Sequence, residues 1–130
     1  MASIFSKIIS GEIPCHKISE TDKFLAFLDV FPLVHGHVLV VPKKETDYIF
    51  DIEDAELAEM MVFAKTVSKA IRKAVPCKRI GVAVIGLEVP HAHIHLVPMN
   101  TANDVNFTQP KLSPTKEELI EMASKISKEF

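Results

Sequence analysis

Residues 91–98 read His-Ala-His-Ile-His-Leu-Val-Pro, and three of the six histidines of the chain recur there at every second position. Successive side chains of an extended strand point to opposite faces of a sheet. A strand therefore places His91, His93 and His95 on one face and the apolar residues between them on the other. Imidazoles titrate near neutral pH, so a row of them suits catalysis, phosphate contact or metal binding.

Three chemical roles are open to this row of imidazoles. A purely structural role is unfavourable, because a core would have to desolvate three polar rings and find partners for each. Imidazole is a good zinc ligand, but His91 and His95 lie about 13 Å apart in a strand that rises roughly 3.3 Å per residue. A nucleophilic role uses all three positions, since one imidazole attacks phosphorus while its neighbours orient it and hold the phosphoryl oxygens. The middle position favours His93 as the nucleophile.

The overall composition narrows the possible partners. A chain of 130 residues fits one domain. With 15 basic and 17 acidic residues the net charge is −2, and no long basic run occurs, so binding to a nucleic-acid polymer is not expected. No apolar stretch is long enough to cross a bilayer and no leader pattern opens the chain, so we expect a cytoplasmic protein without a membrane partner. Cys15 and Cys77 are expected to be reduced thiols.

The hydrophobic periodicity predicts an α+β domain with an antiparallel sheet of about five strands. One long helix follows from apolar residues at three- and four-residue intervals, and Pro76 closes it. The expected elements in chain order are a short helix over 3–11, strands over 17–20, 24–29 and 37–42, the long helix over 51–75, a strand over 80–85, a turn at 86–88 and the histidine strand.

The C-terminal part is expected to add an arm and a helix to a core of about residues 3–100, all within a single domain of residues 1–130. Residues 100–112 are polar and have no regular period, which indicates a loop or an arm. Ser113 is expected to cap a terminal helix, with Pro114 at its first position and carboxylates in its first turn.

The histidine stretch resembles the signature of the histidine triad (HIT) family, in which three histidines alternate with apolar residues. Residues 4–14, 27–30 and 36–44 are similar to the other stretches shared by the Hint, or protein-kinase-C-interacting-like, branch of that family. The resemblance implies a HIT-like fold and a homodimer whose two sheets are joined. It also implies hydrolysis or transfer at the α-phosphate of purine nucleotide conjugates, with nucleoside phosphoramidase activity that releases AMP.

The same resemblance implies a role for each site residue. His93 would become nucleotidylated, His95 would contact the α-phosphate, His91 would orient His93, and His37 would complete the imidazole cluster. Asp29 would accept hydrogen bonds from the ribose, although from the residues alone a turn-capping role is preferred. The residues that would line the base pocket, each of which could instead be a core residue, are Phe5, Ile8, Phe27 and Val30. No cofactor or metal is required.

The chain departs from this branch at Gly86-Leu87-Glu88, where a Gly-Gln-Ser or Gly-Gln-Thr sequence is usual. The loss of that amide and hydroxyl removes groups that contact phosphate, and Glu88 could replace them as a proton donor if burial raised its pKa. An alternative function is therefore a purine-nucleotide-binding regulatory or interaction module with little turnover. Metal sequestration through His37, His91 and His93 is a third hypothesis.

Overall fold

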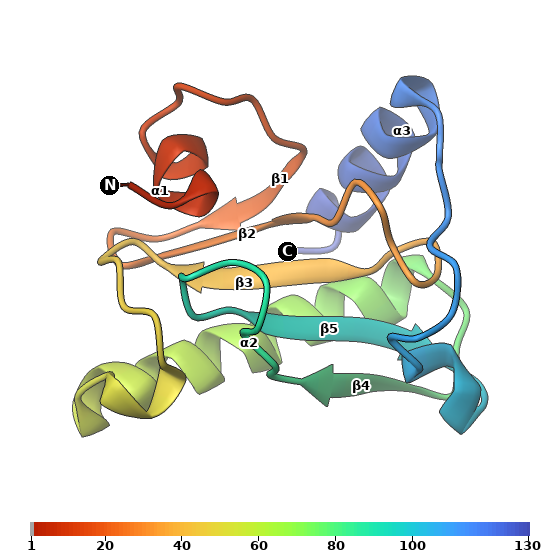
Figure 1. Cartoon of the computed structure of the whole chain (residues 1–130). Helices are drawn as coiled ribbons and strands as arrows, with labels where there is room; N and C mark the ends of the chain where they lie inside the picture. The colour runs from red at the N-terminus through yellow and green to blue at the C-terminus, as the bar shows by residue number, and fades with distance from the viewer. Residues whose placement is uncertain (1) are drawn as a thin grey trace.

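Five antiparallel strands form one sheet in the order β1-β2-β3-β5-β4, and helices lie on both of its faces (Figure 1). The computed structural model describes residues 2–130. Its strands are β1 (Lys17–Glu20), β2 (Phe24–Leu28), β3 (Val38–Pro42), β4 (Arg79–Ala83) and β5 (Ile94–Met99), and its helices are α1 (Ile4–Ile9), α2 (Asp54–Ala74) and α3 (Lys116–Ser127), with short 3-10 helices η1 (Ile49–Asp51) and η2 (Ala102–Val105). The predicted α+β class and five-stranded sheet are confirmed.

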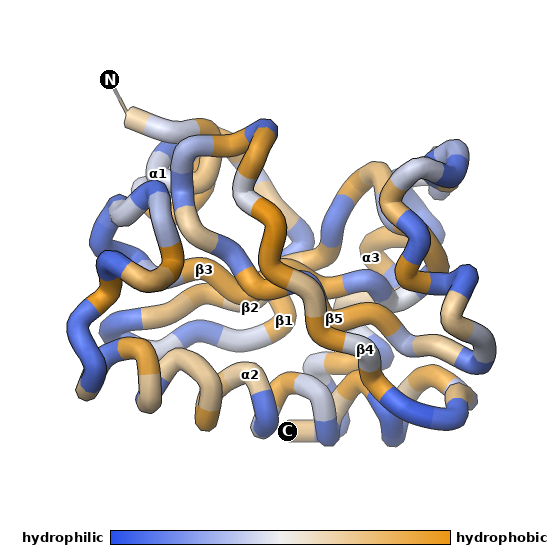
Figure 2. The backbone as a smooth tube through the Cα atoms, turned by 60° about the horizontal axis from the view of Figure 1, so that its bottom comes forward, coloured by the Kyte–Doolittle hydropathy of each residue, from blue (hydrophilic) through white to orange (hydrophobic). Residues whose placement is uncertain are grey.

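The long helix α2 covers one face of the sheet, and α3 packs beside it against β1 and β2. Apolar and polar residues alternate along α2 as it turns, which Figure 2 shows as alternating colours. Ala92, Ile94 and Leu96 are buried in this core. The predicted two-faced character of the histidine stretch is therefore confirmed, although β5 itself begins only at Ile94.

The opposite face of the sheet carries a smaller apolar cluster under α1. Phe5 of α1 packs there on Leu25, Phe27, Leu39 and Val41, which alternate with the residues of the main core along β2 and β3. Ser3 caps α1 as predicted, because its hydroxyl oxygen accepts a hydrogen bond from the Ser6 N–H at 3.0 Å. The histidines share this second face with α1, which places a short helix next to the row of imidazoles.

The start of α3 differs from the prediction that Ser113 caps it. The cap is Thr115, whose hydroxyl accepts from the Glu118 N–H at 3.1 Å while the Glu118 carboxylate accepts from the Thr115 N–H at 2.8 Å. This reciprocal pair satisfies two backbone N–H groups. A capping box at Ser113 would need an acceptor side chain three residues later, and Lys116 at that position has only donors. The prediction at Ser113 is wrong for this reason, and Pro114 precedes the cap.

Within residues 2–130, no helix combines the length and apolar content that crossing a bilayer would need.

Candidate active site

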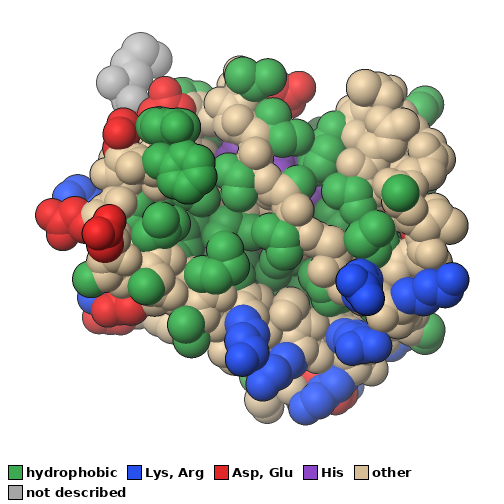
Figure 3. Space-filling model, turned by 90° about the horizontal axis from the view of Figure 1, so that it is seen from below, with side chains coloured by type: hydrophobic (Ala, Val, Ile, Leu, Met, Phe, Trp, Pro, Cys, Tyr) green, Lys and Arg blue, Asp and Glu red, His purple; other side chains and the backbone are tan. Residues whose placement is uncertain are grey.

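A cavity of about 510 Å³ opens on the α1 side of the sheet. Figure 3, which looks from below Figure 1 toward the β4 edge, shows histidine side chains in a recess among hydrophobic ones. Segments far apart in sequence build its walls, and the lining residues are Ile4, Phe5, Asp29, Phe31, His37, Leu39, the loop 85–89, His93, His95, Phe107 and Lys111. The fold therefore brings Phe5, Asp29, His37, Glu88, His93 and His95 of the predicted site to one cavity.

The ring of His93 is held in a single tautomer. Its Nδ1 lies 2.7 Å from the carbonyl oxygen of His91, which can only accept a hydrogen bond, so the Nδ1–H donates. The neutral ring then carries an unprotonated Nε2. Phe5 packs against the ring at a centroid distance of 5.0 Å and limits its rotation. A lone pair on a fixed imidazole in a cavity is what a nucleophile toward phosphorus needs.

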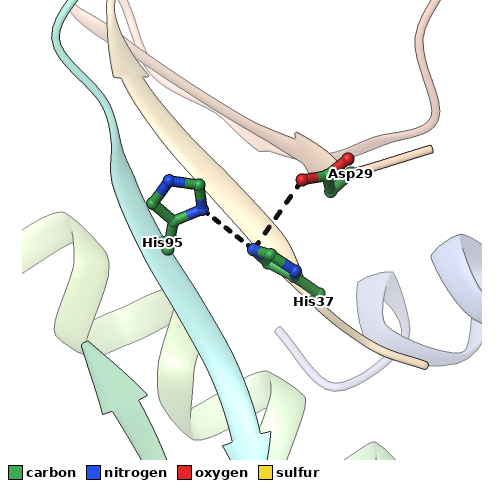
Figure 4. Close-up of side chains that lie close together, drawn as sticks. All are labelled: Asp29, His37 and His95. Carbon is green, nitrogen blue, oxygen red and sulfur yellow. Dashed lines mark hydrogen bonds and ion pairs between the residues drawn. The ribbon is translucent and has the colours of Figure 1, made fainter. Parts of the chain in front are cut away.

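The His37 and His95 rings are joined by a hydrogen bond (Figure 4). We call this pair the His37–His95 relay, and a backbone N–H decides which ring donates. The Leu33 N–H donates to Nδ1 of His37 at 3.0 Å, so the proton of the neutral His37 ring is on Nε2. That Nε2–H donates to Nδ1 of His95 at 2.9 Å. His95 therefore carries its own proton on Nε2, as a hydrogen-bond donor beside His93, whose ring centroid is 4.8 Å away.

Both rings of the relay are uncharged near neutral pH. Burial lowers the pKa of His37 to about 3, with a further contribution from the neighbouring His95. Burial also lowers the pKa of His95 to about 4, assisted by His93 and Lys111. His95 thus presents a neutral Nε2–H to the cavity. The hydrogen bond from His37 to Nδ1 fixes which nitrogen of His95 carries the proton.

Asp29 follows β2 at the entrance to this relay. Its Oδ1 accepts from the Phe31 N–H at 3.0 Å, and its Oδ2 lies 3.8 Å from Nε2 of His37. Burial raises the pKa of the Asp29 carboxyl. The residue therefore caps the turn after β2 and also faces the cavity, where Oδ2 is free to accept a ligand hydroxyl.

His91 is fully buried and does not line the cavity. Its Nε2–H donates to the Pro42 carbonyl at 2.8 Å, and its Nδ1 accepts from the Ser3 hydroxyl at 2.7 Å. The Ser3 N–H in turn donates to Oε1 of Glu45 at 2.7 Å. The side chain of His91 thus ties α1 to the end of β3, and its backbone carbonyl, not its ring, orients His93.

The predicted base-pocket residues lie in different places. Phe5 lines the cavity. Phe27 is buried beneath Phe5, and the centroids of the two rings are 5.6 Å apart. Ile8 packs partly buried against the same apolar cluster. Val30 is exposed and is not among the lining residues. Only Phe5 of the four is therefore placed to touch a ligand in the cavity as it stands.

Phe107 and Lys111 were not predicted, and both line the cavity from the segment after η2. The Phe107 ring packs edge-on against His95 at 4.7 Å and against His37 at 6.3 Å between centroids. Phe107 is an isolated aromatic residue in a polar stretch, which is the one signal that could have singled it out.

The donor atoms of Asp29, His37 and His95 lie within 4.8 Å of one another, so a metal must be considered. A metal-bound histidine normally donates its second ring N–H to an acceptor. Here the second nitrogen of His37 receives the Leu33 N–H instead, which leaves the nitrogen facing the cluster protonated. The donor set does not fit a metal ion in this hydrogen-bonded arrangement.

A model of the HIT domain family matches residues 10–102. An adenosine 5′-monophosphoramidase of Schizosaccharomyces pombe is 33% identical over 129 residues, which cover 98% of this chain and 97% of that protein. A HIT-like protein of Bartonella henselae, described as involved in cell-cycle regulation, superposes with a TM-score of 0.85 at 30% identity, covering 98% of this chain and 96% of that one. A zinc-bound histidine triad protein of Mycobacterium smegmatis superposes with a TM-score of 0.84 at 26% identity over 99% and 93% of the two chains.

Proposed function

Because the chain belongs to the HIT domain family, we propose that it is a nucleotide hydrolase acting at the α-phosphate of nucleoside 5′-monophosphoryl conjugates. The name of the Schizosaccharomyces pombe relative supports a phosphoramidase type of substrate. The observation that carries the proposal is the unprotonated Nε2 of His93, held in the cavity beside the N–H of His95. A nucleophile and a donor for a phosphoryl oxygen therefore lie side by side.

The proposed reaction is a double displacement. Nε2 of His93 attacks the α-phosphorus, and the bond from phosphorus to the leaving amine breaks as the amine takes the electron pair and a proton from solvent. Water then attacks the phosphorus, loses a proton to solvent and releases Nε2 of His93 with its electron pair. The Nε2–H of His95 donates to a phosphoryl oxygen and stabilises its growing charge. Asp29 accepts from the ribose hydroxyls, and Phe5 packs on the base.

We propose that this chemistry needs no metal or cofactor, because imidazole N–H groups supply the charge stabilisation. The direction of the hydrogen bond from His37 to His95 supports this, since Nε2 of His37 carries a proton and the lone pair on Nδ1 of His95 accepts that proton's hydrogen bond. Protein purified without a histidine tag and dialysed against EDTA is expected to keep its rate. A rate that disappears on dialysis and returns with zinc would contradict the metal-free mechanism.

Release of AMP from adenosine 5′-phosphoramidate tests the function itself. The wild-type protein is expected to turn over, and His93→Ala is expected to lose roughly 10³-fold or more in kcat. Lys69→Met, an exposed change on α2, serves as the control for handling and purity. Tight AMP binding with no hydrolysis of the conjugate would instead favour the alternative, a nucleotide-binding module with little turnover.

We further propose that the chain forms a homodimer through β4. This strand lies at one end of the sheet, so its outer edge has unpaired backbone groups. Val82, Val84 and Ile85 in and after it are exposed, and Leu87 is 89% exposed. Sedimentation should give the mass of two chains for the wild type and for Ile120→Lys on α3, and of one chain for Val82→Lys. A monomeric wild type would exclude the proposed assembly.

A further inference from the structure

A set of hydrogen bonds behind the cavity has no role in the proposed reaction. Oε1 of Glu45 accepts from the Ser3 N–H and from the Ser6 hydroxyl, each at 2.7 Å. The Ser3 hydroxyl accepts from the Ser6 N–H at 3.0 Å and donates to Nδ1 of His91 at 2.7 Å. We call Ser3, Ser6, Glu45 and His91 the α1 network. None of these four residues lines the cavity, so the α1 network can act on the reaction only through other residues.

Each proton of the α1 network has one place. Hydrogen bonds from the Ser3 N–H and the Ser6 hydroxyl lower the pKa of the Glu45 carboxyl to about 2, so this carboxylate only accepts. The Ser6 hydroxyl therefore donates to Glu45. The Pro42 carbonyl accepts from Nε2–H of His91 at 2.8 Å, which leaves Nδ1 of His91 to accept from the Ser3 hydroxyl. The His91 ring is thus held between α1 and the end of β3 by two hydrogen bonds of fixed direction.

Two contacts connect the α1 network to the proposed nucleophile. The His91 carbonyl accepts from Nδ1–H of His93 at 2.7 Å. The Phe5 ring of α1 lies 5.0 Å from the His93 ring and 5.8 Å from the His91 ring, measured between centroids. A displacement of α1 or of His91 would therefore move the groups that hold the His93 ring.

The position of α1 depends on these hydrogen bonds. The helix has six residues, and a helix of that length is not stable alone in water. Glu45, which bonds its first turn, is fixed in turn because the Thr46 carbonyl accepts from the Ala92 N–H at 2.7 Å. The helix α1, residues 45–46 and residues 91–92 are therefore bonded to one another in a closed ring.

We propose that Ser3 and Glu45 are positioning residues, which keep Nε2 of His93 unprotonated and directed into the cavity by fixing α1 and His91. The inference rests on the proposed function, because it names residues that act through the proposed nucleophile. Loss of the α1 network should leave the substrate contacts in place and let the His93 ring leave the geometry of attack. A misplacement of about 1 Å can lower a rate roughly 100-fold. The effect is therefore expected on kcat and not on KM.

Four variants assayed with adenosine 5′-phosphoramidate test this role, at a temperature at which each variant is fully folded. Glu45→Ala and Ser3→Ala are expected to lower kcat roughly 10-fold to 100-fold, with KM changed less than about twofold. Glu45→Gln should keep most of kcat, since its amide oxygen still accepts from both donors of α1. Thr115→Ala is the matched control, because it removes the equivalent side-chain cap from α3, and it should keep the wild-type rate.

The tautomer of His93 gives a second measurement, which does not depend on turnover. Nitrogen-15 NMR of the ring at pH 8, above the ordinary histidine pKa of about 6.5, distinguishes the two neutral tautomers. The Nδ1–H form is expected in the wild type and in Thr115→Ala. A larger share of the Nε2–H form is expected in Glu45→Ala and Ser3→Ala.

Several outcomes would overturn the proposal. An unchanged tautomer in the two alanine variants of the α1 network would do so, because the His91 carbonyl would then hold the His93 ring unaided. A raised KM with an unchanged kcat would assign the α1 network to binding, and an equal loss of kcat in Thr115→Ala would reduce its effect to general destabilisation. If the wild type does not hydrolyse the phosphoramidate, the proposed function fails, and the NMR comparison alone decides the positioning role.

Discussion

Acidification should destabilise the protein through the buried His37–His95 pair. In the unfolded chain each imidazole binds a proton near its ordinary pKa of about 6.5. In the folded chain burial lowers the pKa to about 4 for His95 and to about 3 for His37. Between these values the unfolded state binds more protons than the folded state, so stability is complete above pH 6.5 and falls as the pH decreases toward 4 and 3.

The size of the effect follows from the same values. At pH 5 protonation favours the unfolded chain by about 2 kcal/mol for each fully shifted histidine. His95 is less deeply buried than His37, so we expect a combined loss of about 2 to 4 kcal/mol between pH 7 and pH 5. Asp29 acts in the opposite direction, because its pKa is raised in the folded state. A comparison with variants that lack one imidazole is therefore required.

Urea denaturation at pH 7 and pH 5 measures this loss for the wild type, for His37→Gln and for His95→Gln. The wild type is expected to lose more free energy of unfolding on acidification than either variant, by about 1 to 2 kcal/mol. The two effects will not add, since each ring depresses the protonation of the other. Equal losses in all three proteins would refute the argument that the relay is neutral and buried.

Three further substitutions test a backbone turn, a helix cap and the packing against His95. Gly36→Ala should destabilise the protein by about 1 to 3 kcal/mol in urea denaturation, because Gly36 has φ +94° and an added Cβ would lie 3.1 and 3.2 Å from two side chains. Thr115→Ala should cost about 1 kcal/mol by the same measurement, through loss of the α3 cap; an unchanged midpoint would place the cap elsewhere. Phe107→Ala should lower kcat/KM for adenosine 5′-phosphoramidate up to roughly tenfold, since the ring fixes His95; an unaffected rate would deny it that positioning role.

Structure is predicted correctly from the sequence where the local residue pattern agrees with the burial of those residues in the fold. The alternation of His91, His93 and His95 with apolar residues corresponds to two real faces of the sheet, because a strand with a period of two has only those faces. The cap of α3 was misplaced at Ser113 although the Thr115-x-x-Glu118 pattern of a capping box was present in the sequence.

The missed parts of the site depend on contacts between distant segments. Phe107 contacts His95, and Lys111 lies beside the Phe107 ring, only because the chain turns back over the sheet after β5. No periodicity of the local sequence predicts that return. The tautomers of His37 and His93 were equally out of reach, since they follow from the Leu33 N–H and the His91 carbonyl. The amino-acid sequence does not show which backbone group will fix the proton of a histidine ring.

Mass analysis of the quenched reaction tests the central claim most directly. Wild-type protein mixed with adenosine 5′-phosphoramidate and quenched within one turnover is expected to gain the mass of one adenylyl group, and peptide mapping should place it on His93. His93→Ala should show no adduct under the same conditions. An adduct on another residue, or AMP release from a wild type that never gains mass, would contradict a mechanism in which His93 is the nucleophile.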